Sequence, residues 1–203
     1  MGEGRLTPGL AFFGAGLGLL GVSAAIEASI VLGGGLDTGA LSEDLTRLVL
    51  VPWAMGLVFF GYAYDRPEVL WSRALGRRVV AAYALFADGA IHMLAIGEHV
   101  DTPIHVVFFA TLAPVQLASA WLLIRGGPSL LRGWVLGAFG LIALYVVSRI
   151  TTLPIVGGDY RVEPLGILSK GTEIVLLAAL VQELRAQAAS RRRKPAGGPT
   201  AQT

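Results

Sequence analysis

Six apolar runs of roughly 20 residues each constrain the fold of this chain more than any other feature. They cover residues 10–33, 45–64, 79–98, 104–124, 133–153 and 165–184. An α-helix of about 20 residues spans the hydrocarbon core of a bilayer. Only 15% of the residues are charged and 54% are hydrophobic, whereas about a quarter of a soluble domain is charged. We therefore expect an all-α integral membrane bundle of six transmembrane helices, with the lipid bilayer as its main partner.

The six runs belong to one domain, which we place at residues 1–187. The remaining residues, 188–203, are polar and basic, and we expect a disordered tail at the cytoplasmic face of the membrane. The net charge of +2 is too small to indicate nucleic acid as a partner, and a basic cluster beside the last run is more simply a topology anchor. The chain has no cysteine, which excludes disulfides and thiolate metal ligands.

The distribution of Lys and Arg predicts the orientation of the bundle. With the N-terminus inside, twelve of the 16 basic residues fall on the cytoplasmic side and four on the outer side. Positive charge collects in the cytoplasmic loops of membrane proteins. The sequence therefore predicts a multi-pass protein of a bacterial-type inner or plasma membrane, with both the N and the C terminus cytoplasmic.

The third run and the residues after it carry all three histidines of the chain. Asp88 and His92 lie inside the run, Glu98 and His99 end it, and His105 follows a short turn. At 100° per residue, Asp88, His92 and His99 share one stripe with several alanines, while the bulky side chains lie opposite. We expect this polar, small-residue stripe to form part of the functional site.

Ionisable side chains of several runs reach a similar depth in the predicted topology. A charge at the centre of a membrane helix costs about 2.5–3.5 kcal/mol on insertion scales, so each one needs a physical reason. The polar groups of the outer half are Glu27, Asp88, His92, Glu98, His99, His105, Gln116, Arg149, Lys170 and Glu173. We expect a polar site that faces outward, above an inner half that is mostly apolar.

Spacing divides these groups into two levels. His92 and His99 are separated by about 10.5 Å along a helix, too far to share one metal ion. The deeper level has Asp88 and His92 as primary metal ligands, joined by Glu27 and Glu173, and suits iron, manganese or zinc. The rim level consists of Glu98, His99 and His105; it suits zinc or copper, or guards the entrance. We expect Gln116, Arg149 and Lys170 to support the site.

Several functions fit this pattern, and the sequence leaves them open. The plainest is an ion network with only a structural role. The functional hypothesis is a transition metal (Zn, Fe, Mn or Cu) held for redox, hydrolytic or structural use. The alternatives are a small proton-coupled transporter or channel and an accessory subunit of a larger membrane complex. No nucleotide-binding, hydrolase or HExxH motif is present, so the sequence leaves open whether the protein is an enzyme.

Small residues line one face of the first and fifth runs. They are Gly14, Gly18 and Gly21 in the first run, and Gly133, Gly137 and Gly140 in the fifth. Small residues let membrane helices approach closely. We expect these faces to pack within the bundle; contact with a second copy or with a larger membrane complex is the alternative.

Overall fold

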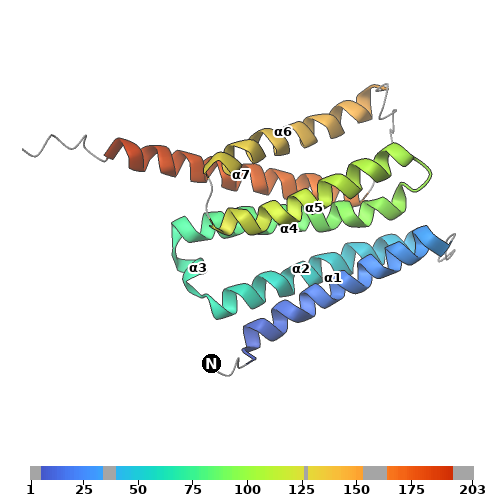
Figure 1. Cartoon of the computed structure of the whole chain (residues 1–203), viewed down its shortest axis with the longest axis horizontal. Helices are drawn as coiled ribbons and strands as arrows, with labels where there is room; N and C mark the ends of the chain where they lie inside the picture. The colour runs from blue at the N-terminus through green and yellow to red at the C-terminus, as the bar shows by residue number, and fades with distance from the viewer. Residues whose placement is uncertain (1–5, 34–39, 126–127, 153–163, 194–203) are drawn as a thin grey trace, which may run out of the picture.

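The computed structural model describes residues 6–33, 40–125, 128–152 and 164–193. All regular structure in these ranges is helical, which confirms the all-α class (Figure 1). The helices are α1 (Pro8–Gly33), α2 (Ala40–Asp65), α3 (Glu68–Trp71), α4 (Arg73–Glu98), α5 (Pro103–Arg125), α6 (Pro128–Ile150) and α7 (Pro164–Arg193).

Five helices, α1, α4, α5, α6 and α7, are long and apolar enough to cross a membrane. Helix α2 holds a shorter apolar stretch, Val49–Asp65, among the residues searched, so the sixth span stays a prediction. Large apolar side chains point outward from the bundle, and Leu136 and Phe139 of α6 are 74% and 64% exposed. Such surfaces are stable in lipid and unfavourable in water, so the chain fits a membrane protein.

Proline begins four of the helices, α1, α5, α6 and α7. The first residues of a helix have no intrahelical partner for their N–H, so proline costs nothing there and its fixed φ favours the helix. This explains why α6 begins five residues before the predicted start at 133. Helix α7 continues to Arg193, six residues into the segment predicted as a tail, and residues 194–203 lie outside the described part.

Helix α4 occupies the centre of the bundle (Figure 1). It packs along α5 on one side and along α7 on another, and the pair α1–α2 reaches it mainly through α1. Helix α6 packs on α7 and barely touches α5. The start of α1 and the end of α7 lie at the same end of the bundle as α3, on the left in Figure 1.

Two apolar clusters hold α4 in place. The first joins Leu85 of α4 to Leu123 of α5, Trp134 of α6 and Leu180 of α7. The second joins the other side of α4 to α1 and α2, through residues such as Ile91. The first cluster fills the half of the bundle nearer α3. The polar stripe of α4 continues from this cluster toward the α4–α5 turn.

The glycines that allow close packing of α1 are not those predicted. A Cβ added to Gly14, Gly18 or Gly21 meets no atom within 4 Å, so this face packs against no helix in the described part of the chain. At Gly16 an added Cβ would lie 2.6 Å from the Ala54 carbonyl oxygen, and at Gly61 it would lie 2.4 Å from the Phe13 nitrogen. The buried glycines therefore form the α1–α2 contact.

The glycine face of α6 also lacks the predicted helix contact. An added Cβ at Gly133 or Gly140 meets no atom within 4 Å, and at Gly137 it meets the ring of Trp134 of the same helix. These three glycines instead line a groove beside α5. The predicted packing role is therefore wrong for both glycine faces within the described residues.

Candidate metal centre and its cavity

A tight turn between α4 and α5 brings the two rim histidines together. The N–H of Thr102 donates to the His99 carbonyl over 2.9 Å, and Pro103 then begins α5. The rings of His99 and His105 meet edge to face, with centroids 5.1 Å apart. Nδ1 of His99 lies 2.9 Å from the Ala95 carbonyl oxygen. This turn therefore brings together His99 and His105 of the predicted rim, while a second metal ion held by these two and Glu98 stays a prediction.

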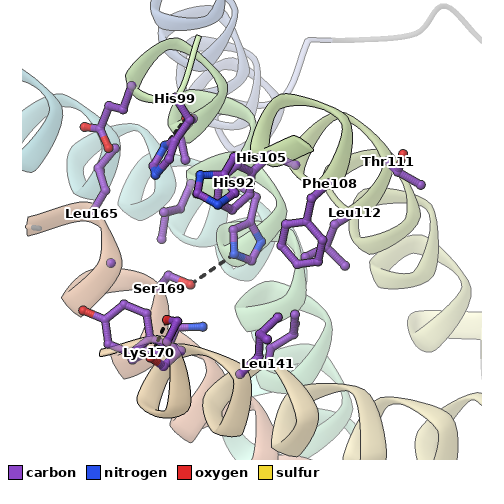
Figure 2. A pocket seen from close by; sticks show the side chains of 18 of the residues that line it. His92, His99, His105, Phe108, Thr111, Leu112, Leu141, Leu165, Ser169 and Lys170 are labelled. Carbon is purple, nitrogen blue, oxygen red and sulfur yellow. Dashed lines mark hydrogen bonds between the residues drawn. The ribbon is translucent and has the colours of Figure 1, made fainter. Parts of the chain in front are cut away.

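A cavity of about 580 Å³ lies between α4, α5, α6 and α7 beside this turn (Figure 2). Its polar lining includes Glu98, His99, His105, Arg149, Ser169 and Lys170, and the rest is mostly aliphatic or aromatic. The Arg149 guanidinium lies 4.6 Å from the centroid of the Tyr145 ring, and Lys170 Nζ lies 5.3 Å from it. One aromatic ring thus holds two cations at the cavity wall.

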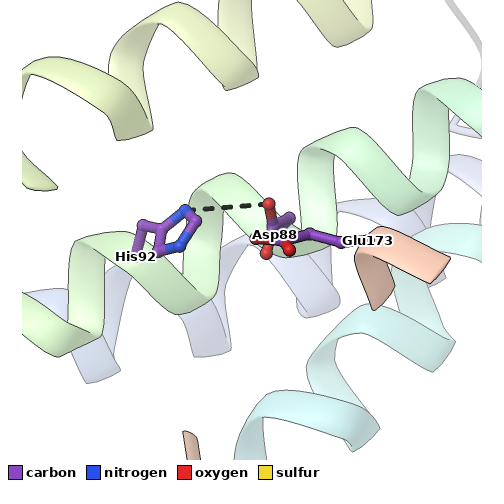
Figure 3. A group of neighbouring side chains, drawn as sticks. All are labelled: Asp88, His92 and Glu173. Carbon is purple, nitrogen blue, oxygen red and sulfur yellow. Dashed lines mark ion pairs between the residues drawn. The ribbon is translucent and has the colours of Figure 1, made fainter. Parts of the chain in front are cut away.

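Three potential metal ligands converge next to the cavity (Figure 3). Asp88, His92 and Glu173 each offer one ligand atom, and these atoms all lie within 4.8 Å of one another. Asp88 and Glu173 are fully buried and His92 is 5% exposed. Asp88 and His92 are neighbours on α4 because they are four residues apart, while α7 supplies Glu173 from the facing side. Glu173 thus joins Asp88 and His92, as the sequence predicted.

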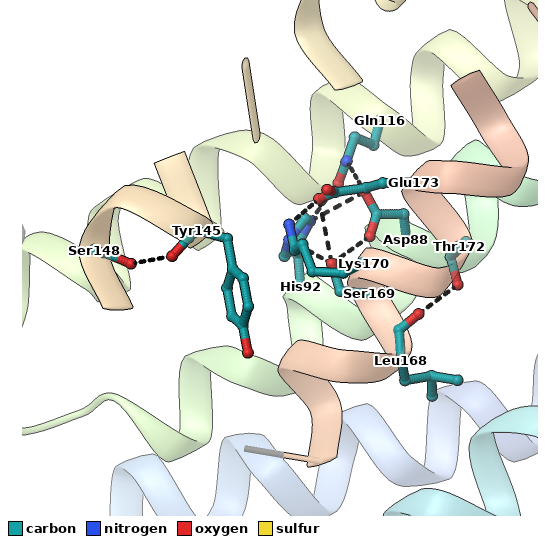
Figure 4. Close-up of polar contacts among 10 residues, drawn as sticks. All are labelled: Asp88, His92, Gln116, Tyr145, Ser148, Leu168, Ser169, Lys170, Thr172 and Glu173. Carbon is teal, nitrogen blue, oxygen red and sulfur yellow. Dashed lines mark hydrogen bonds and ion pairs between the residues drawn. The ribbon is translucent and has the colours of Figure 1, made fainter. Parts of the chain in front are cut away.

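Two further buried side chains bridge these ligands (Figure 4). Gln116 of α5 donates from Nε2 to Asp88 Oδ2 over 2.5 Å, and its Oε1 lies 2.7 Å from His92 Nδ1. Ser169 of α7 donates to Asp88 Oδ1 over 2.7 Å. Three helices therefore supply one continuous hydrogen-bond network around Asp88.

This network assigns the tautomer of His92. An ionised carboxylate only accepts hydrogen bonds, so Gln116 must turn its NH₂ group to Asp88 and its oxygen to His92. Nδ1 of His92 must then carry the proton that Gln116 accepts. With His92 neutral, Nε2 keeps its lone pair, and the Ser169 hydroxyl, 3.4 Å away, gives its single proton to Asp88. A neutral imidazole nitrogen in this state is a metal ligand.

Glu173 is held by one of its two oxygens. Its Oε1 accepts from the Lys170 ammonium and lies 3.3 Å from Ser169 Oγ. Its Oε2 is buried and has no hydrogen-bond partner within the described part of the chain. An unsatisfied buried oxygen costs about 1–3 kcal/mol, and more for a charged group. This oxygen is therefore available to a ligand.

A glycine next to Asp88 lets α5 come close enough to complete the network. A Cβ added to Gly89 would lie 3.1 Å from Gln116 Cβ and 3.2 Å from the Ala113 carbonyl oxygen. Any side chain at this position would push α5 outward. Gly89 thus sets the helix separation at which the Gln116 amide spans Asp88 and His92.

The remaining predicted residues take different places. Gln116 and Lys170 contact the ligands directly, whereas Arg149 lies on Tyr145 at the cavity wall. The side chain of Glu27 lies outside the described part of the chain, so its role stays a prediction.

The sequence reasoning missed Ser169, although its place four residues before Glu173 puts both on one face of α7. It also missed a second polar cluster, in the half of the bundle expected to be mostly apolar. There Glu183 Oε2 accepts from Arg77 Nε over 3.1 Å, and Oε1 accepts from Arg78 Nε over 2.9 Å. The opposite charges of Arg77 and Arg78 on α4 and of Glu183 on α7 could have predicted this cluster from the sequence.

Comparisons with protein-family models, curated proteins and solved structures give no match for this chain. The site therefore has to be interpreted from its own chemistry. One imidazole nitrogen and two carboxylates, buried together beside a cavity, form a donor set that suits a divalent transition metal.

Proposed function

We propose that this protein binds one divalent transition metal ion through Asp88, His92 and Glu173 and exposes it to the adjoining cavity. The unpartnered, buried Glu173 Oε2, in a group whose three ligand atoms lie within 4.8 Å of one another, is the observation that carries the proposal. Three protein ligands leave coordination positions for a substrate or water, as in catalytic rather than structural metal sites. Zinc, iron and manganese suit this mixed nitrogen and oxygen set.

Charge balance favours a bound cation over an ion network with only a structural role. With both carboxylates ionised, Lys170 charged and His92 neutral, the group carries one net negative charge inside the bundle. A buried charge without compensation is strongly destabilising. A divalent ion reverses this to one net positive charge, which a single anionic ligand from the cavity neutralises. The metal-free group is therefore neutralised by a cation, and the metal-bound group by an anion, that enters through the cavity.

We propose six membrane crossings with both termini cytoplasmic, in an inner or plasma membrane of bacterial type. The start of α1 and the end of α7 share one end of the bundle with α3 (Figure 1), as an even number of crossings requires. Arg66, Arg73, Arg77 and Arg78 surround α3, in agreement with the positive-inside rule. In this orientation the cavity opens toward the cell exterior or periplasm.

The lipid-facing glycines of α1 support the proposal that a second copy or another membrane subunit packs on this face. Gly14, Gly18 and Gly21 have open space where a partner helix fits closely.

The metal proposal is tested by elemental analysis of the protein purified without chelator. We expect about one zinc, iron or manganese per chain, as three protein ligands for one ion imply. Asp88→Asn and His92→Ala should each abolish this metal. Glu183→Gln is the matched control, because Glu183 is also a buried carboxylate on α7 and lies outside the site.

Two outcomes would overturn the proposal. One is a wild-type protein that contains no metal and takes up none of the three ions on dialysis. The other is metal that the Asp88→Asn and His92→Ala variants retain in full. In either case Asp88, His92 and Glu173 form an ion network with only a structural role.

A further inference from the structure

We infer that the cavity binds a single-chain lipid amphiphile, with its anionic head beside the metal centre and its chain between α5 and α6. The position of the head rests on the proposed metal site, while the path of the chain rests on the shape of the bundle alone. The inference thus names the substrate class of the proposed centre.

A second groove shows where the hydrocarbon chain of the lipid would lie. This groove runs along α6 and meets α5 at Leu112; its α6 lining consists of Trp134, Gly133, Gly137, Gly140 and neighbouring leucines. It shares Leu112, Leu141 and Leu144 with the cavity, so the two spaces adjoin at these side chains. The groove exists because α5 and α6 hardly touch and because three glycines of α6 leave room where other residues would fill it.

The length and lining of this path fit a lipid chain. From Gly133 to Ser148 the two spaces follow about 22 Å of α6, which exceeds the ~15 Å depth of one leaflet. The groove lining is apolar and sits between helices whose outer faces are apolar too, as the exposed Leu136 shows. A chain can therefore enter sideways from the bilayer without leaving an apolar environment.

Polar residues gather at the other end of this path, in the cavity (Figure 2). Arg149 and Lys170 are the cations of the lining and Glu98 is its one carboxylate; Lys170 is also the partner of Glu173 in the buried group. The Tyr145 hydroxyl also lines this region and has no hydrogen-bond partner in the described part of the chain. Cations and a hydroxyl donor select a head with anionic oxygens.

The His92 lone pair connects this head position to the metal centre. His92, Ser169 and Lys170 line the cavity and also belong to the buried network. A carboxylate or phosphate head at this wall reaches the coordination positions that the protein leaves open. It also supplies the one negative charge that balances the group formed by the divalent ion, Asp88, Glu173 and Lys170.

Tryptophan fluorescence offers a direct test, because Trp134 lines the groove. Phenylalanine replaces the exposed Trp53, Trp71 and Trp121, so that only Trp134 emits. Doxyl-labelled stearic acid, added to the detergent-purified protein, should quench Trp134 saturably. Unlabelled palmitate and hexadecyl phosphate should compete, and the stronger competitor identifies a carboxylate or a phosphate head. Hexadecyltrimethylammonium should compete about tenfold more weakly, the effect of losing one charge-assisted contact.

Gly140→Phe should abolish saturable quenching, because its side chain enters the open space of the groove. Gly133→Leu at the other end of the groove is the second blocking variant. Gly18→Phe on α1 is the matched control, since it also adds a side chain to open space but lies outside the groove. All three variants should keep the far-ultraviolet circular dichroism spectrum and the thermal midpoint of the wild type, which shows that the bundle has folded. Quenching that is not saturable, or that survives both blocking variants, would overturn the inference.

The metal-free Asp88→Asn variant separates this inference from the proposed function. We expect it to bind the labelled stearic acid but to discriminate less between anionic and cationic heads. If the wild type contains no metal but still shows saturable quenching sensitive to Gly140→Phe, the lipid site is supported and the metal site is refuted. Equal competition by all three heads would overturn the anionic-head assignment.

Discussion

Replacing Gln116 with leucine tests the buried network most directly. Leucine has a similar volume but removes the amide that donates to Asp88 over 2.5 Å and faces His92 over 2.7 Å. On the scale of measured interhelical bonds in membranes, about 0.6 kcal/mol each, the two losses amount to about 1 kcal/mol. With a charged acceptor left unsatisfied, the soluble-protein scale gives about 2–4 kcal/mol. We expect the free energy of unfolding to fall by about 2 kcal/mol.

In Gln116→Leu, metal affinity should fall by more than the loss of folding stability alone would cause. Without Gln116, the proton of His92 Nδ1 loses its 2.7 Å acceptor and faces only Asp88 Oδ2, 3.7 Å away, so the lone pair on Nε2 is held less firmly. Loss of a group that orients a ligating histidine typically costs 10–100-fold in metal affinity. Zinc affinity is measured by competition with a chromogenic chelator. The imidazole ¹⁵N spectrum of the metal-free protein reports the tautomer, and the chain has only three histidines.

Ser119→Ala is the matched control for this experiment. Ser119 is also buried and lies three residues further along α5. Its replacement therefore shows what the loss of a nearby buried polar group does to zinc affinity. We expect its zinc affinity to stay within about twofold of the wild type, far less than a ligand-orienting residue costs. If Gln116→Leu also binds zinc within twofold of the wild type, Gln116 does not position His92. An unchanged ¹⁵N spectrum in Gln116→Leu would refute the tautomer assignment itself.

Three further predictions concern the helices around the site. Gly89→Leu should push α5 away from α4 and abolish zinc binding, measured as the loss of bound metal after gel filtration. Glu183→Leu leaves the partly exposed Arg77 and Arg78 without their carboxylate; we expect a lower thermal midpoint with unchanged metal content. In cells, a membrane-impermeant thiol reagent should label Thr102→Cys from outside and Leu70→Cys only after lysis, since the native chain has no cysteine. Labelling of Leu70→Cys in intact cells would invert the proposed topology.

The helices of this protein could be predicted because their signal is local. Each apolar run satisfies its backbone hydrogen bonds internally, as lipid requires, so its length and composition are enough to identify it. The helix ends are harder to predict: hydropathy alone begins the fifth run at residue 133, whereas Pro128 marks the start of α6. Helix α7 continues past its apolar part, because arginines and alanines favour a helix as well as leucine does.

The site could be predicted in part, because side-chain chemistry is visible in sequence and helix separation is not. Asp88 and His92 are paired by their spacing on α4 alone. Joining them to Glu173 required only that charged groups at one depth avoid lipid. Gly89 has a role only when α5 is known to lie against it, and the empty faces at Gly18 and Gly140 become visible in the same way. Glycine patterns show where helices can approach, not where they do.

The two buried carboxylates of α7 differ in a way that favours the proposed metal centre over an ion network with only a structural role. Glu183 lies near the arginine-rich end, and both of its oxygens accept hydrogen bonds, from Arg77, Arg78 and Gln187. Glu173 lies about 15 Å deeper along the same helix, with one oxygen left without a hydrogen bond among the described residues. If both glutamates served stability alone, the deeper one would be the better satisfied, because desolvation costs it more. The opposite arrangement supports the proposal that Glu173 serves a ligand that arrives through the cavity.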